Sequence, residues 1–120
     1  MKVFDTSALL AFVRREAGAA VVQDSLGLPE DNLVSAVTWA EIVAIAARYQ
    51  VSIQPLAELV TVVPFGAADA AASQMFLRKD VSLGDRCCLA TALSYKVPVV
   101  TADGAWTALF GHFVTVEQIR

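Results

Sequence analysis

The stretch Val97-Pro98-Val99-Val100-Thr101 is the clearest interior strand in this chain. Its β-branched residues favour extended backbone. Pro98 is tolerable only near the beginning of such a strand, because proline cannot donate a hydrogen bond to a neighbouring strand. This segment therefore predicts one strand inside a sheet, and the rest of the chain can be placed around it.

Outward from this segment, short β-like runs alternate with helical patterns. The other expected strands are Lys2–Asp5, Leu33–Ser35, Thr61–Phe65 and Phe113–Val116. The expected helices cover roughly Ser7–Arg14, Ala17–Leu26, Val37–Tyr49, Ala67–Arg78, Leu83–Tyr95 and Ala105–Phe110. Strands that alternate with helices imply parallel pairing through right-handed crossovers. The prediction is an α/β fold, a three-layer α/β/α sandwich with a central, mainly parallel sheet of about five strands, in a single domain of residues 1–120.

The composition fits one domain without a membrane segment. The chain has 120 residues, of which 57% are hydrophobic, yet no apolar run approaches the roughly 18 residues that a bilayer span needs. A strand pattern begins at the N-terminus and leaves no room for a signal peptide. Cys87 and Cys88 are neighbours that point about 100° apart on a helix, so we expect buried free thiols rather than a disulfide. These features predict a cytoplasmic protein in a reducing compartment.

The net charge of −3 argues against a general nucleic-acid binder. That argument weakens if four of the 12 acidic residues hold a cation, because 8 acids then remain against 9 basic residues. Basic residues cluster at Arg14-Arg15 and Arg78-Lys79. Phosphate contacts and ordinary solvated helix ends are both open for these pairs. The single histidine, His112, has no partner at zinc-site spacing and receives no role.

Four carboxylates, those of Asp5, Glu41, Asp85 and Asp103, are the candidate functional groups. In a parallel sheet, strand C-termini and helix N-termini share the edge where ligands of open α/β sheets bind. Asp5 ends the first strand, and Asp103 follows Thr101 by two residues. Glu41 and Asp85 lie in the first turns of their helices, and Glu41 is off the apolar stripe of its helix. That stripe comprises Trp39, Ile42, Val43, Ala46 and Tyr49.

Four negative charges at one edge repel one another unless a cation lies between them. Oxygen-only ligands suit Mg²⁺ or Mn²⁺, which commonly support cleavage of phosphate esters. Each acid also has an ordinary structural explanation. Asp5 could cap a helix, Asp103-Gly104 is a common turn pair, and Ser82-Leu83-Gly84-Asp85 matches a capping box. Glu41 could be a plain surface residue.

Four short motifs resemble, in order and spacing, those of the PIN-domain ribonucleases, and in particular the VapC-type toxins of bacterial toxin–antitoxin pairs. They are Asp5-Thr6-Ser7-Ala8-Leu9-Leu10, Trp39-Ala40-Glu41-Ile42, Ser82-Leu83-Gly84-Asp85-Arg86 and Thr101-Ala102-Asp103-Gly104-Ala105-Trp106. The resemblance covers essentially the whole chain. It implies a metal-dependent endoribonuclease that hydrolyses RNA phosphodiesters, with Asp5, Glu41, Asp85 and Asp103 as catalytic ligands of one or two Mg²⁺ or Mn²⁺ ions.

The resemblance also implies supporting residues and partners. Ser7 and Thr101 match hydroxyl positions expected to hydrogen-bond the carboxylates or metal-bound water. Apart from the resemblance, the basic residues Arg86, Arg14 and Lys79 are candidates for contact with RNA phosphate, and pairing of Arg86 with a neighbouring acid is equally open. The toxins that this chain resembles form homodimers and bind an antitoxin that blocks the acidic groove. An apolar surface through Val13, Ala17, Val21 and Val22 could serve such contacts, or these side chains could pack in the core.

Three other interpretations have specific weaknesses or remain open. A haloacid-dehalogenase-like phosphatase would need a second Asp where Ser7 stands. A receiver domain would need an acid ending the third strand, which reads Val62-Val63-Pro64-Phe65. A catalytically silent interaction module on the same fold stays open, although the presence of all four acids argues against lost activity.

Overall fold

Five parallel strands form the central sheet of the computed structural model, which describes residues 1–120. The strands are β1 (Lys2–Phe4), β2 (Asn32–Ser35), β3 (Thr61–Val63), β4 (Val99–Thr101) and β5 (Val116–Gln118). Their order across the sheet is β3-β2-β1-β4-β5, and every neighbouring pair is parallel. The predicted parallel sheet of about five strands is therefore confirmed.

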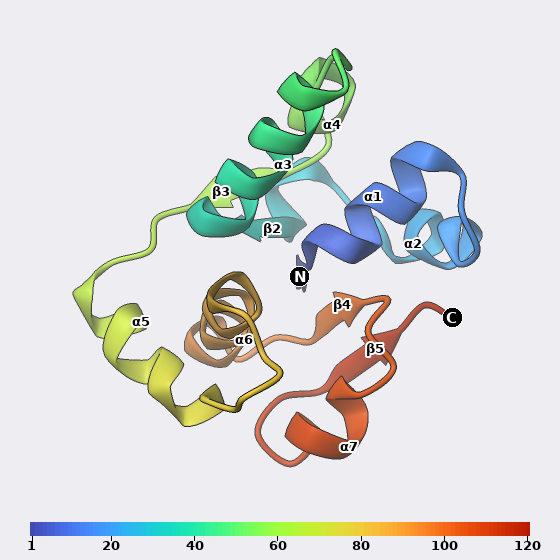
Figure 1. The fold of residues 1–120 in the computed structure, drawn as a ribbon. Helices are drawn as coiled ribbons and strands as arrows, with labels where there is room; N and C mark the ends of the chain where they lie inside the picture. The colour runs from blue at the N-terminus through green and yellow to red at the C-terminus, as the bar shows by residue number, and fades with distance from the viewer.

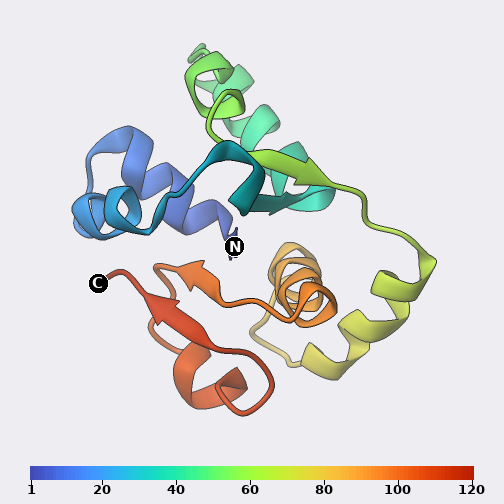
Figure 2. The same ribbon diagram turned by 180° about the vertical axis from the view of Figure 1, so that it is seen from behind.

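Helices cover both faces of this sheet (Figures 1 and 2). The helices are α1 (Thr6–Arg14), α2 (Ala19–Ser25), α3 (Ala36–Arg48), α4 (Gln54–Ala57), α5 (Ala67–Ala72), α6 (Leu83–Tyr95) and α7 (Trp106–Phe110), with 3₁₀ turns η1 (Pro29–Asp31) and η2 (Ser73–Phe76). The blue-to-green helices α1 to α4 lie on one side of the strands, and the yellow-to-red helices α5 to α7 lie on the other. This arrangement confirms the predicted three layers.

Two apolar cores, one on each face of the sheet, hold the layers together. On β1, Val3 belongs to the core with α6 and α7, and Phe4 belongs to the core with α1 and α3. Both side chains are fully buried. Successive residues of a strand point to opposite faces, so β1 is apolar at consecutive positions because both of its faces are covered.

The sequence prediction misplaced two elements. The last strand was expected at Phe113–Val116, but Phe113 lies in the turn after α7. Its ring packs edge-on against the ring of Phe76, with the two ring centroids 5.9 Å apart. The strand starts at Val116, the residue that pairs with Val99 of β4. The helix expected over Ala67–Arg78 ends as an α-helix at Ala72 and tightens into η2. At that point the Ser73 hydroxyl donates to the Ala70 carbonyl at 2.6 Å, a local bond that competes with the regular helix.

The apolar stripe expected on α3 is only partly correct. Ile42 is buried, but Val43 is 40% exposed and Tyr49 is 59% exposed. Thr38, four residues before Ile42, is fully buried instead. Because α3 contacts both α1 and α6, its buried face runs through Thr38 and Ile42 rather than through Val43 and Tyr49.

The structure also places the two cysteines and the start of α1. Cys87 and Cys88 are buried free thiols, as expected. Asp5, Ser7 and the start of α1 lie beside the C-terminal end of β4. None of the helices combines the length and the apolar character that a bilayer crossing requires.

Candidate active site

The strand order places a natural binding position between β1 and β4. From β1 the chain builds β2 and β3 on one side of the sheet, and then β4 and β5 on the other. The carboxyl ends of the strands on either side of such a reversal form the usual ligand crevice of an open α/β sheet. Asp5 directly follows β1, and its backbone N–H donates to Val100 of β4 at 2.9 Å. Asp103 lies two residues beyond β4, so these two acids flank the reversal.

Asp5 is a buried carboxylate that two hydroxyl groups hold in place. Its residue surface is only 5% exposed. Ser7 Oγ donates to Asp5 Oδ2 at 2.6 Å, and Thr101 Oγ1 donates to the same oxygen at 3.0 Å. Asp5 occupies the N-cap position of α1 but makes no side-chain capping bond. Helix capping therefore does not explain this acid.

Backbone groups after β4 fix the orientation of both hydroxyls. Ser7 Oγ accepts the Ala102 N–H at 3.0 Å, and Thr101 Oγ1 accepts the Asp103 N–H at 3.0 Å. Each hydroxyl has one proton to donate. Since backbone N–H groups approach these oxygens as donors, the hydroxyl protons are free for the Asp5 carboxylate. The network thus connects the Asp5 side chain to the backbone of Asp103.

The environment of Asp5 disfavours its ionised form. The pKa of Asp5 is raised from 3.8 to about 6, mainly by burial and also by the nearby negative charge of Asp85. The bonds from Ser7 and Thr101 act in the opposite direction. No basic side chain compensates this carboxylate, because the one salt bridge in the structure joins Lys2 to Glu117. Asp5 is therefore a buried acid without a basic partner.

Asp85 has a structural role at the start of α6 as well as a position near Asp5. Its backbone N–H donates to Ser82 Oγ at 3.1 Å, and its Oδ2 accepts the Ser82 N–H at 3.4 Å. This is the capping box that the sequence suggested as an alternative. Partial burial raises the pKa of Asp85, and the charge of Asp103 adds to this effect.

Glu41 reaches the same region from α3. Thr6 Oγ1 donates to Glu41 Oε1 at 3.2 Å, and the Glu41 carboxylate lies against Gly84 in the first turn of α6. Although Glu41 is an exposed residue, partial burial of its carboxylate raises its pKa. The negative charge of Asp85 raises it further.

The four acids share one edge and influence one another, but they do not converge on a point. Asp85 affects the pKa of both Asp5 and Glu41, and Asp103 affects that of Asp85. Asp103 itself is exposed, and its Oδ1 accepts the Ala105 N–H at 2.9 Å in a turn. No three His, Cys, Asp or Glu side chains are close enough together to hold a metal ion as they stand.

The chemistry of this edge nevertheless suits a hard divalent cation. Every candidate donor is a carboxylate or hydroxyl oxygen, the ligand type that Mg²⁺ and Mn²⁺ prefer. A buried Asp5 without a basic partner, next to a second acid, is an arrangement that a cation would stabilise. The residues that could hold it are Asp5, Glu41, Asp85 and Asp103.

The three basic residues expected to contact RNA lie at different places. Arg86 directly follows Asp85, is half-buried, and has a buried Nε without a hydrogen-bond partner. Lys79 is exposed in the turn before α6. Arg14 lies at the opposite end of α1 from Asp5, about 13 Å away along the helix axis. Its guanidinium lies over the Tyr49 ring, 5.3 Å from the centroid.

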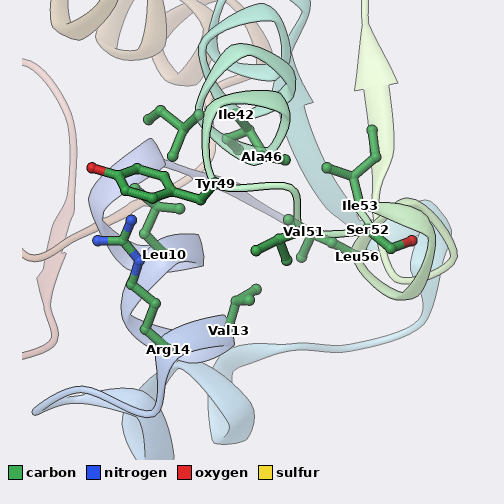
Figure 3. A pocket seen from close by; sticks show the side chains of 11 residues that line it. Leu10, Val13, Arg14, Ile42, Ala46, Tyr49, Val51, Ser52, Ile53 and Leu56 are labelled. Atoms are coloured by element: carbon green, nitrogen blue, oxygen red, sulfur yellow. The ribbon is translucent and has the colours of Figure 1, made fainter.

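The cavities of the structure lie away from the acids. One of about 430 Å³ is lined by apolar residues of α1, α3 and the segment that leads into α4 (Figure 3). Leu10 and Val13 face Ala46 and Val51 across it, and Arg14 and Tyr49 lie at its side. No acid lines any of the three cavities.

Two residues of the candidate site were not singled out by the sequence prediction. Thr6 contacts Glu41, and Gly84 provides the surface against which the Glu41 carboxylate rests. Both lie inside the quoted motifs, so their positions were visible. Their contacts with Glu41 depend on how α3 packs beside α1 and α6, which the motifs do not specify.

Comparison with known proteins identifies the family. The sequence pattern described as PIN domain matches residues 2–109. The chain belongs to the PIN domain family. Members of this family are in general nucleases, and the predicted PIN-like fold is confirmed. No curated protein has significant sequence similarity to the chain.

Several solved structures share this PIN fold. A toxin–antitoxin complex from Klebsiella pneumoniae has a TM-score of 0.80 at 20% identity, covering 100% of this chain and 98% of that chain. VapBC-1 from nontypeable Haemophilus influenzae has a TM-score of 0.74 at 19% identity, covering 98% of this chain and 96% of that chain. FitAcB from Neisseria gonorrhoeae has a TM-score of 0.66 at 25% identity, covering 97% of this chain and 96% of that chain.

Proposed function

We propose that this PIN domain protein is a metal-dependent endoribonuclease and the toxin of a type II toxin–antitoxin pair. The observation that carries the proposal is the buried, uncompensated Asp5 at the strand-order reversal, with three further acids on the same edge. Membership of a nuclease family supports the reaction class. Similarity in fold to toxin–antitoxin complexes supports the biological role.

In the proposed mechanism, Asp5, Glu41, Asp85 and Asp103 hold one or two Mg²⁺ or Mn²⁺ ions. A divalent ion bound there would make a water molecule a better nucleophile and neutralise charge on the phosphate. Ser7 and Thr101 keep the Asp5 carboxylate in one orientation through their bonds to Oδ2. The position of Asp85 at the N-terminus of α6 favours its ionised form and opposes the effect of burial.

The RNA would approach this edge past the start of α6. Arg86 is the best placed of the three basic candidates, because it adjoins Asp85 and forms no salt bridge within the protein. Lys79, exposed just before α6, is suited to a weaker phosphate contact. Arg14 lies at the far end of α1 and is better suited to a partner at the apolar cavity than to the scissile phosphate.

The proposed partners are an RNA substrate, a second copy of the toxin and a cognate antitoxin, acting together in the cytoplasm. The apolar cavity in Figure 3 is suited to an apolar segment of the antitoxin, with Arg14 available to an acidic group at its side. Of the apolar surface expected from the sequence, Val22 is buried in the core, whereas Val13 is 45% exposed and lines this cavity.

The partner surface can be tested by co-expression with the product of the adjacent open reading frame. Val13→Glu should prevent formation of the complex, because it places a charge in the apolar cavity. Val43→Glu is the matched control, since Val43 is 40% exposed but lines none of the cavities. Equal complex formation by both variants would remove this surface from the proposal.

RNA cleavage tests the activity directly. The purified protein with Mn²⁺ or Mg²⁺ should cut single-stranded RNA, and EDTA should stop the reaction. Asp5→Asn should abolish cutting while circular dichroism shows an unchanged fold. Asp24→Asn, an exposed acid on α2, should cut at the wild-type rate. Equal cutting by wild type and Asp5→Asn would exclude the proposed site.

One observation favours the alternative of a catalytically silent interaction module. The acids do not form a group of three that could hold a metal ion as they stand. A silent module would bind neither Mn²⁺ nor Mg²⁺ in calorimetry and would cut no RNA, yet it would still bind the antitoxin. Metal binding by the wild-type protein would exclude it.

A further inference from the structure

Glu41 lies on α3, the helix between β2 and β3. Its carboxylate contacts the first turn of α6, where Asp85 lies. At Gly84, the residue before Asp85, its carboxylate occupies the space where any other residue would place a side chain. A Cβ added at Gly84 would lie 2.5 Å from Glu41 Oε1 and 2.7 Å from Cδ and Oε2. The three nearest atoms all belong to this one carboxylate.

A Cβ at Gly84 would meet a side chain, whereas a Cβ at either of two other crowded glycines, Gly18 and Gly111, would meet a backbone carbonyl. A Cβ at Gly18 would meet the Ile119 carbonyl at 2.7 Å, and a Cβ at Gly111 would meet the Thr107 carbonyl at 2.5 Å. Those contacts involve backbone, which cannot move without disturbing the fold. At Gly84 the obstructed group is the end of a flexible side chain, so the fold can tolerate a methyl group if the Glu41 carboxylate moves.

Gly84 is also not required by its backbone conformation. It lies in the first turn of α6 and has no positive φ angle. Alanine is a better helix former than glycine, so helix propensity alone would favour alanine here. The absence of a side chain at this position therefore serves the approach of Glu41 rather than the helix.

From these contacts we propose that Gly84 is a positioning residue for the metal ligand Glu41. The bare backbone of α6 at Gly84 and the Thr6 hydroxyl, which donates to Oε1 at 3.2 Å, together hold the Glu41 carboxylate beside Asp85. Any side chain at position 84 displaces that carboxylate from the other acids. This proposal rests on the proposed function, because it assigns Gly84 a role in the same metal site.

The test is a double-mutant cycle between positions 84 and 41, with Mn²⁺ affinity measured by calorimetry and thermal stability measured on the metal-free protein. Gly84→Ala should weaken Mn²⁺ binding about tenfold, as is typical when a residue that orients a ligand is changed. Its melting temperature should equal or exceed that of the wild type. Gly66→Ala is the methyl-addition control, because the nearest atom to a Cβ there is 3.9 Å away, and it should bind Mn²⁺ like the wild type.

The Glu41→Ala background separates positioning from any general effect of the methyl group. With Glu41 absent, Gly84→Ala should cause no further loss of affinity. An equal loss in both backgrounds, or wild-type affinity in Gly84→Ala, would overturn the positioning role and leave the metal site standing. If the wild-type protein binds no Mn²⁺ at all, the metal site itself fails, and the assignment of Gly84 fails with it.

Discussion

Replacing Asp5 by Asn should make the metal-free protein more stable at neutral pH while removing its ability to bind metal. Burial raises the pKa of Asp5 from 3.8 to about 6, which means that the folded protein disfavours the ionised form. At about 1.4 kcal/mol per pH unit, this corresponds to a cost of about 3 kcal/mol in the folded state above pH 6. Asparagine carries no charge and keeps an oxygen that can accept from Ser7 and Thr101.

The sign of this effect gives a distinct pH profile. Because the folded state holds the Asp5 proton more tightly than the unfolded state does, the contribution of Asp5 to wild-type stability falls as pH rises from about 4 to about 6 and then stays low. The gain from Asp5→Asn should therefore be near zero at pH 4 and should reach about 3 kcal/mol at pH 8.

Urea unfolding in EDTA at several pH values measures this difference in the free energy of unfolding. Asp24→Asn on the exposed face of α2 is the control and should change stability by less than about 0.5 kcal/mol at any pH. Saturating Mn²⁺ should then stabilise the wild type but not Asp5→Asn. A gain from Asp5→Asn that is absent at pH 8, or that does not vary with pH, would refute the argument from burial.

Three further outcomes follow from the same structure. Thr101→Val should destabilise the protein by about 1–3 kcal/mol in urea unfolding, because the buried Asp5 carboxylate and the Asp103 N–H each lose a partner; an unchanged midpoint would contradict this network. Mn²⁺ affinity measured by calorimetry should fall by up to about tenfold per pH unit below pH 6, where Asp5 holds a proton, and a flat profile from pH 5 to 8 would count against Asp5 as a ligand. Cys87 and Cys88 should not react with a thiol reagent in the native protein, since both are buried and burial raises the pKa of each thiol; rapid labelling without unfolding would show that α6 is less well packed than described.

The sequence predicted the ends of an element most accurately where capping residues mark them, as they do for α6. The helix Leu83–Tyr95 was predicted with its observed ends, and its start carries the Ser82–Asp85 capping box that the sequence suggested. In the structure Lys96 ends the helix in a left-handed conformation. The last strand was misplaced because Phe113 and Val114 resemble strand residues. In the structure the register with β4 begins only at Val116.

The candidate site was predicted at the level of topology but not of side-chain geometry. Alternation of strands and helices was enough to predict that Asp5 and Asp103 share one edge of the sheet. That they lie on the two sides of the strand-order reversal is seen only in the structure. Whether carboxylate oxygens meet depends on the angle between α3 and α6 and on rotamers, which residue spacing does not encode. For that reason the contact of Glu41 with Thr6 and Gly84, and the wider spread of the four acids, appeared only in the structure.

The central claim is that acids from separate segments of the chain, Asp5 among them, bind a divalent cation. The most direct measurement is anomalous X-ray scattering from a crystal of the wild-type protein soaked in Mn²⁺, with an Asp5→Asn crystal treated in the same way. We expect a manganese peak within bonding distance of Asp5 and at least one of Glu41, Asp85 and Asp103, and no such peak in the variant. A peak elsewhere on the surface, or the same peak in both crystals, would contradict the claim.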